Sequence, residues 1–155
     1  MTAQRPDRRR VLAGAAGTVL AVALRPAGAA PLPRTETTES AIRRFAGTSA
    51  IRPGRVTLDL PPLVENGNTV PLSVSVESPM IPADHVRRIG VFNERNPQPN
   101  VLTADLGPRA GRATITTRIR LATSQRITAV AEMSDGTFWS DTADVIVTLA
   151  ACVEG

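Results

Sequence analysis

Residues 112–121 read Arg-Ala-Thr-Ile-Thr-Thr-Arg-Ile-Arg-Leu and carry the clearest strand pattern in the chain. Small or apolar side chains alternate with polar ones throughout this stretch. The inner-face positions are Ala113, Ile115, Thr117, Ile119 and Leu121. Strict alternation is typical of a β-strand that buries one face and leaves the other in water. We therefore predict a strand here whose inner face packs into a core.

Six further segments show strand patterns, and each is bounded by proline, glycine, asparagine, aspartate or serine. They are residues 55–60, 69–77, 86–93, 101–106, 125–133 and 137–149. Ser134-Asp135-Gly136 separates the last two and predicts a tight hairpin turn. About seven strands with one buried face predict an all-β fold, namely an antiparallel β-sandwich of immunoglobulin-like type.

The rest of the chain divides around this sandwich. We expect an export signal over residues 1–29, a linker and short helix over 30–54, the sandwich over 55–149 and a C-terminal arm over 150–155. The helix is predicted at residues 39–46, because apolar side chains share one face and a glycine follows. Removing 29 of the 155 residues leaves a single domain, which buries about two-thirds of its unfolded surface.

The first 30 residues contain the three parts of an export signal. Four arginines precede an apolar run of residues 11–24, and Ala27-Gly28-Ala29 offers a small-residue cleavage site. The run is shorter than the roughly 20 residues that span a bilayer, so no membrane span is expected. Arg8 and Arg9 lie in a segment that resembles the twin-arginine signal, and an ordinary secretory signal is the alternative.

Charge excludes one class of partner. All 18 basic residues are arginines, against 14 acidic residues, and this gives a net charge of +4. Five of the arginines and one aspartate fall within residues 1–29, so the mature chain carries 13 charges of each sign. Its net charge is therefore zero. The basic character belongs to the signal, and a nucleic-acid-binding function is not expected.

Cys152 is the only cysteine, and it follows the last predicted strand on a short arm. A single cysteine cannot form an internal disulfide, and an unpaired one in an exported protein indicates intermolecular pairing or a reactive thiol. The alternative is a small buried hydrophobic residue. However, alternation from Leu149 places Ala151 and Val153 on the inner face instead. Extended chain would carry Cys152 roughly 10 Å beyond Leu149.

The surroundings of Cys152 favour attachment over catalysis. Glu154 and the terminal carboxylate are close in sequence, and their negative charge is expected to raise the pKa of the thiol above its usual value of about 8.5. His85 is the only histidine, so the usual His/Cys metal clusters cannot be built, and we expect His85 on the surface. No cofactor, metal site or independent enzymatic activity is expected.

Two loops are also distinctive. Residues 65–68, Glu-Asn-Gly-Asn, are predicted to form a turn, because Gly67 and Asn68 adopt positive φ at little cost. Residues 92–99 form a polar loop with two prolines and two asparagines. This second loop is either a rigid connection or a surface that a partner recognises.

Several of these motifs together resemble the SoxY family of sulfur-oxidation proteins. They are residues 65–71, 78–80, 93–99, 117–122 and 134–136, together with the exported cysteine arm. The resemblance implies an immunoglobulin-like sandwich that pairs with SoxZ. It also implies that Cys152 holds sulfur intermediates covalently and presents them to periplasmic enzymes of sulfur oxidation.

The arm departs from the Gly-Gly-Cys-Gly-Gly ending of the family's thiosulfate carriers. Here it reads Ala150-Ala151-Cys152-Val153-Glu154-Gly155 and is similar to a SoxY-related variant with an Ala-Ala-Cys-Ile-Glu arm. Alanine and the β-branched Val153 restrict the arm, so the identity of its cargo is left open. Two alternatives also stay open: a binding or structural subunit with an intermolecular disulfide, and a redox protein that uses Cys152 catalytically.

Overall fold

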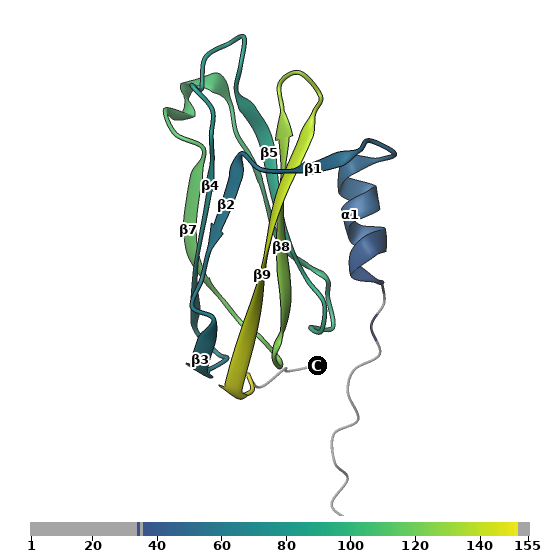
Figure 1. The fold of residues 1–155 in the computed structure, drawn as a ribbon, viewed down its shortest axis with the longest axis vertical. Coiled ribbons are helices and arrows are strands. Elements are labelled where there is room, and N and C mark those ends of the chain that lie inside the picture. Colours follow the sequence, from purple (N-terminus) through teal and green to yellow (C-terminus); the bar gives the residue numbers. More distant parts are fainter. Residues whose placement is uncertain (1–33, 35, 152–155) are drawn as a thin grey trace, which may run out of the picture. The chain divides into compact units, whose positions relative to one another are not determined.

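The structure is a computed structural model that describes residue 34 and residues 36–151 (Figure 1). The predicted export signal with Arg8 and Arg9 lies outside the described residues, as do Cys152, Val153, Glu154 and Gly155 of the arm. Within the described residues, no helix is both long enough and apolar enough to cross a membrane.

The described residues form two β-sheets packed face to face, with one α-helix outside them (Figure 1). The larger sheet has the strand order β1-β9-β8-β5-β6, and β3 also pairs with β9; the smaller sheet has the order β2-β4-β7. The elements are α1 (Thr38–Ala46), β1 (Ile51–Pro53), β2 (Val56–Asp59), β3 (Leu63–Asn66), β4 (Val70–Val76), β5 (Val86–Asn93), β6 (Asn100–Asp105), β7 (Thr114–Ile119), β8 (Gln125–Met133) and β9 (Phe138–Leu149), with a short 3₁₀ turn at Pro108–Ala110. This confirms the all-β sandwich.

The core between the sheets is aliphatic and follows the predicted alternation. In β4, Val70, Leu72, Val74 and Val76 are buried, while the residues between them are exposed or half-buried. Fully burying a side chain of this kind contributes about 1.5–3 kcal/mol. The alternation is therefore what fixes which face of each sheet turns inward.

Two short parallel strands depart from the predicted seven antiparallel strands. β1 pairs with the first residues of β9, and β3 pairs with the last ones. Between them, the Asp141 carboxylate accepts a hydrogen bond of 2.9 Å from the backbone N–H of Leu58. The burial of β1 and β3 does not alternate along the strand, so these two strands depend on pairing with the free edge of β9 rather than on a pattern in their own sequence. Glu65 and Asn66, predicted as part of a turn, belong to β3.

The predicted helix is confirmed as α1, which covers the outer face of the larger sheet. The Thr37 side chain caps it by accepting a hydrogen bond from the N–H of Ser40. The Phe45 ring packs edge-on against Phe92, with ring centroids 5.7 Å apart. Gly90 leaves room for this contact, because a Cβ there would lie 2.9 Å from the Phe92 ring.

Candidate functional site

The anchored part of the cysteine arm reaches as far as Ala151. β9 ends at Leu149, and Ala150 is exposed. Ala151 is only 6% exposed, and its N–H donates a hydrogen bond of 3.1 Å to the carbonyl oxygen of Leu121. The predicted burial of Ala151 is therefore confirmed, but Leu149, from which the alternation was counted, is exposed and does not lie on the inner face. Cys152, the next residue, lies outside the described residues, so its role stays a prediction.

Gly67 holds the two chain segments that meet at this point. Its N–H donates to the carbonyl oxygen of Leu149, and its own carbonyl oxygen accepts from the N–H of Leu121, each at 2.8 Å. These bonds join the end of β9 in the larger sheet to the segment that follows β7 in the smaller sheet. The backbone of Gly67 therefore closes this end of the sandwich.

The reason for glycine at position 67 differs from the predicted one. Gly67 and Asn68 form the predicted turn, but neither adopts a positive φ, so the expected reason for glycine here was wrong. A Cβ on residue 67 would instead lie 2.4 Å from the Leu121 carbonyl oxygen and 2.9 Å from the Ala151 nitrogen. Glycine is required because three backbone segments approach too closely for any side chain.

Asn96 fixes Leu121 from the other side. Its side-chain amide donates a hydrogen bond of 2.8 Å to the carbonyl oxygen of Arg120 and accepts one of 2.9 Å from the N–H of Ala122. The Gln125 side chain donates to the same Asn96 oxygen at 2.8 Å. The residues on both sides of Leu121 are thus held by one half-buried amide group.

The loop that carries Asn96 is itself rigidly bonded. Asn93 is 1% exposed, and its side chain donates to the carbonyl oxygen of Gln98 at 2.8 Å and accepts from the N–H of Asn96 at 2.9 Å. Of the two interpretations of this loop, the structure supports the rigid connection. The sequence did not predict that this loop bonds to the backbone around Leu121, although residues 93–99 and 117–122 were both identified as family motifs.

Side-chain hydroxyls hold the end of β9 as well. Ser124 accepts a hydrogen bond of 2.8 Å from the N–H of Val147, and Thr148 donates one of 3.2 Å to the carbonyl oxygen of Glu65. We call the assembly of Gly67, Leu121, Asn96 and Ala151 the arm root. It brings together the family motifs at 65–71, 93–99 and 117–122 around Ala151, the residue that precedes the predicted cargo residue in the sequence.

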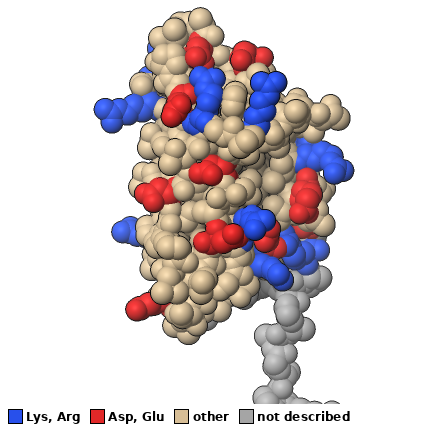
Figure 2. All heavy atoms as spheres, viewed as in Figure 1, with Lys and Arg blue, Asp and Glu red and all other residues tan. Residues whose placement is uncertain are grey.

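Apolar side chains are exposed near the arm root. Leu63, Ile146 and Leu149 are 58%, 59% and 63% exposed, and Leu63 and Ile146 are direct partners across the β3–β9 pair. The lower end of the face in Figure 2, where β3 and β9 end in Figure 1, is mostly free of charged side chains. Neighbouring exposed apolar side chains such as Leu63 and Ile146 are typical of protein contacts.

Of the arginines near the arm root, one forms an ion pair and two do not pair with another described residue. On the neighbouring strands, Arg126 lies 3.0 Å from the Asp144 carboxylate, which raises the pKa of the guanidinium above its usual value by hydrogen bonding and by its charge. Arg118 and Arg120 are exposed, and neither forms an ion pair with another described residue. Their side chains are therefore available to an external negative charge.

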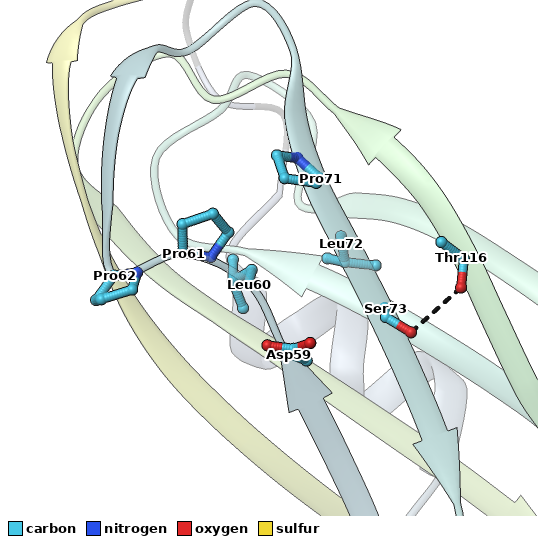
Figure 3. Close-up of a pocket in the computed structure, with 8 residues that line it drawn as sticks. All are labelled: Asp59, Leu60, Pro61, Pro62, Pro71, Leu72, Ser73 and Thr116. Atoms are coloured by element: carbon cyan, nitrogen blue, oxygen red, sulfur yellow. Dashed lines mark hydrogen bonds between the residues drawn. The ribbon is translucent and has the colours of Figure 1, made fainter.

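A hollow lies on the outer side of the smaller sheet and has a volume of about 490 Å³ (Figure 3). Proline rings form part of its wall, and on one side of it the hydroxyls of Ser73 and Thr116, neighbours on β4 and β7, lie 3.2 Å apart. Asp59 is the one ionisable side chain among its eight lining residues. The lining therefore offers no acid–base pair of the kind that hydrolytic catalysis uses.

The described residues do not gather metal ligands. In that part of the chain, no three His, Cys, Asp or Glu side chains come close enough to bind an ion. His85 is a half-buried surface residue whose Nδ1 lies 3.2 Å from the carbonyl oxygen of Ile81. The structure does not bring it to the arm root, and it lines a separate hollow with Arg87 and Glu132.

Comparison with solved structures finds the same sandwich in two kinds of protein. The sulfur carrier protein SoxY from Chlorobium limicola f thiosulfatophilum has 25% sequence identity and a TM-score of 0.61, covering 72% of this chain and 96% of its own. A superoxide reductase (neelaredoxin) from Ignicoccus hospitalis has 18% identity and a TM-score of 0.54, covering 61% and 80%. A putative superoxide reductase from Thermotoga maritima has 21% identity and a TM-score of 0.52, covering 63% and 87%. At these identities, the likeness to the two reductases shows the fold alone.

Comparison by sequence identifies one protein family. No curated protein matches this sequence. The family model described as "Sulfur oxidation protein SoxY" matches residues 42–152, which include α1 from Ile42 onward, the whole sandwich, the arm root and Cys152. The chain belongs to the SoxY family of sulfur oxidation proteins.

Proposed function

We propose that this protein is a covalent carrier of sulfur-containing groups, with Cys152 as the attachment point. The observation that supports this most directly is the extent of the family match, which runs through residue 152 and so includes the only cysteine of the chain. A solved relative that this chain covers to 96% of its length is named a sulfur carrier protein.

The arm root suits a carrier. It delivers Cys152 immediately after Ala151, at the end of a rigid body. Joining the thiol to the sulfane sulfur of a cargo forms a sulfur–sulfur bond, releases the thiol proton and removes two electrons. A separate loading enzyme must accept those electrons. The chain would then be a substrate that other enzymes act on, with no catalytic role and no cofactor of its own.

The place of action and the partners follow from the same proposal. The signal with Arg8 and Arg9 would export the chain to the periplasm by the twin-arginine route, where sulfur-oxidation enzymes would load and unload Cys152. We propose a SoxZ-like subunit as the partner in a heterodimer. The exposed Leu63 and Ile146 support a protein contact, since such side chains gain free energy when a partner removes them from water.

Replacing Cys152 with serine tests the carrier role. The Cys152→Ser variant should fold and form the same complexes as the wild type, but it should carry no sulfur adduct and should not support oxidation of reduced sulfur compounds in a strain that lacks the native protein. Loss of the complexes in Cys152→Ser would favour the alternative of a structural subunit joined by an intermolecular disulfide. A rate shown by the purified wild-type protein alone, and lost in the variant, would favour a redox catalyst.

A further inference from the structure

We propose that Gly67, Leu121 and Ala151 form a releasable latch that sets the working length of the cysteine arm, with Gly67 as a positioning residue. This inference rests on the proposed carrier function. It concerns the described arm root and assigns a role to the 65–71 motif that goes beyond forming a turn.

The closed latch keeps the attachment point near the body of the protein. Because Ala151 is buried and bonded to Leu121, the chain is anchored as far as the residue directly before Cys152 in the sequence. If the Ala151 bond opens, the free arm begins after Leu149 instead. Three extended residues then let Cys152 reach roughly 10 Å beyond Leu149.

The two sides of the latch differ in how firmly they are held. Leu121 is fully buried, and the residues on either side of it are bonded to Asn96, so the acceptor is fixed. Ala151 is held by one backbone hydrogen bond, and its side chain is a single methyl group. Opening therefore breaks the bond from Ala151 to Leu121 first and leaves the body intact.

Gly67 sets the geometry of this bond. Its bonds to Leu149 and Leu121 place the two segments that carry the donor and the acceptor. A Cβ at residue 67 would lie 2.4 Å from the Leu121 oxygen and 2.9 Å from the Ala151 nitrogen, and both distances are shorter than real Cβ contacts. Gly67→Ala must therefore push Ala151 away from Leu121, which favours the released arm.

The test uses the thiol itself, since Cys152 is the only cysteine. The mature chain is treated with iodoacetamide, a small reagent, and in parallel with a maleimide attached to a 5-kDa polyethylene glycol, which needs clearance from the protein surface. The ratio of the two modification rates reports the clearance of Cys152, and it largely cancels changes in thiol reactivity.

Two variants open the latch from opposite sides. Gly67→Ala displaces it sterically, and Ala151→Pro removes the N–H that donates to Leu121. The matched controls are Gly107→Ala, where a Cβ meets nothing within 4 Å, and Ala151→Gly, which keeps the N–H. Loss of one hydrogen bond should raise the bulky-to-small rate ratio about fivefold in the first two variants and leave it unchanged in the controls.

An unchanged ratio in Ala151→Pro would overturn the latch, and so would an equal rise in the two controls. If Gly67→Ala does not fold, Ala151→Pro decides the question alone, because it changes only the segment after β9. The assay needs no cargo, so its outcome is independent of the carrier function. A protein without a sulfur adduct but with the predicted rate ratios would refute the carrier and retain the latch.

Discussion

The two ends of β9 are held in different ways. At its first residues, the hairpin end, side chains do the holding. The Asp135 carboxylate accepts hydrogen bonds from the N–H and hydroxyl of Thr137, and the Trp139 indole donates to the same hydroxyl. The guanidinium groups of Arg52 and Arg55 lie 5.9 and 5.8 Å from the centre of the Trp139 ring.

At the last residues of β9, backbone groups meet at the centre of the arm root, and the side chains of Asn96, Ser124 and Thr148 hold the segments around it. Gly67, Leu121, Leu149 and Ala151 are joined by three hydrogen bonds between main-chain atoms. An end held by side chains loses stability gradually as single groups are changed. An end held by close-packed backbone tolerates no added side chain at its centre, but its last bond opens without any side-chain rearrangement. The second arrangement suits an end that has to release an arm.

The largest expected effect is at Leu121, the fixed side of the arm root. Leu121→Ala should lower the free energy of unfolding by about 2–5 kcal/mol, because a fully buried side chain is replaced by a cavity. Urea denaturation followed by tryptophan fluorescence measures this, since Trp139 is the only tryptophan. A loss below about 1 kcal/mol would mean that this end collapses around the cavity and is not rigid.

The next largest effect is expected for Gly67→Ala, which is compared with the same substitution at Gly107. The added Cβ should destabilise the fold by about 1–3 kcal/mol through overpacking against the Leu121 carbonyl. At Gly107, which has open space and no positive φ, the same change should be neutral or stabilise by up to about 1 kcal/mol. Thermal unfolding of the two variants side by side makes the comparison, and equal melting temperatures would contradict the close approach at Gly67.

The smallest effect is expected at the hairpin end and depends on pH. Hydrogen bonds from Thr137 lower the pKa of Asp135 below its ordinary value of 3.8. A carboxylate with a lowered folded-state pKa stabilises the protein above its unfolded pKa, and this contribution is lost as the pH falls through the folded pKa. The wild type should therefore lose more stability than Asp135→Asn between about pH 4 and pH 2.

Denaturation midpoints at several pH values between 2 and 7 check this prediction. The difference should be smaller than that at Gly67, because Asp135 lies on the surface, where solvent screens its interactions. Parallel pH profiles for the two proteins would show that the Asp135–Thr137 contact contributes nothing to the hairpin end.

Local sequence was sufficient where structure depends on neighbouring residues. β5 and β8 have the predicted bounds, and the Ser134-Asp135-Gly136 turn joins β8 to β9 as expected. The helix begins one residue earlier than predicted and ends at the expected glycine. Each of these features follows from a sequence pattern within two to four neighbouring residues, which can be recognised without knowledge of the rest of the fold.

Long-range contacts account for what the sequence could not predict. β1 and β3 exist because β9 offers them an open edge, about 80 residues away in the chain. The role of Gly67 depends on Leu121 and Ala151, which approach it only after both sheets have formed. Family resemblance marked residues 65–71, 93–99 and 117–122 as important, but only the three-dimensional arrangement shows that they meet at the arm root.

The most direct test of the carrier function is the intact mass of the mature protein, isolated from the periplasm of cells that are oxidising reduced sulfur compounds and measured before and after treatment with a reductant. The proposal predicts a reducible mass increase that maps to Cys152 and corresponds to added sulfane sulfur or a thiosulfonate group, which would also identify the cargo. A bare thiol, or a plain disulfide between two protein chains, under those conditions would contradict it.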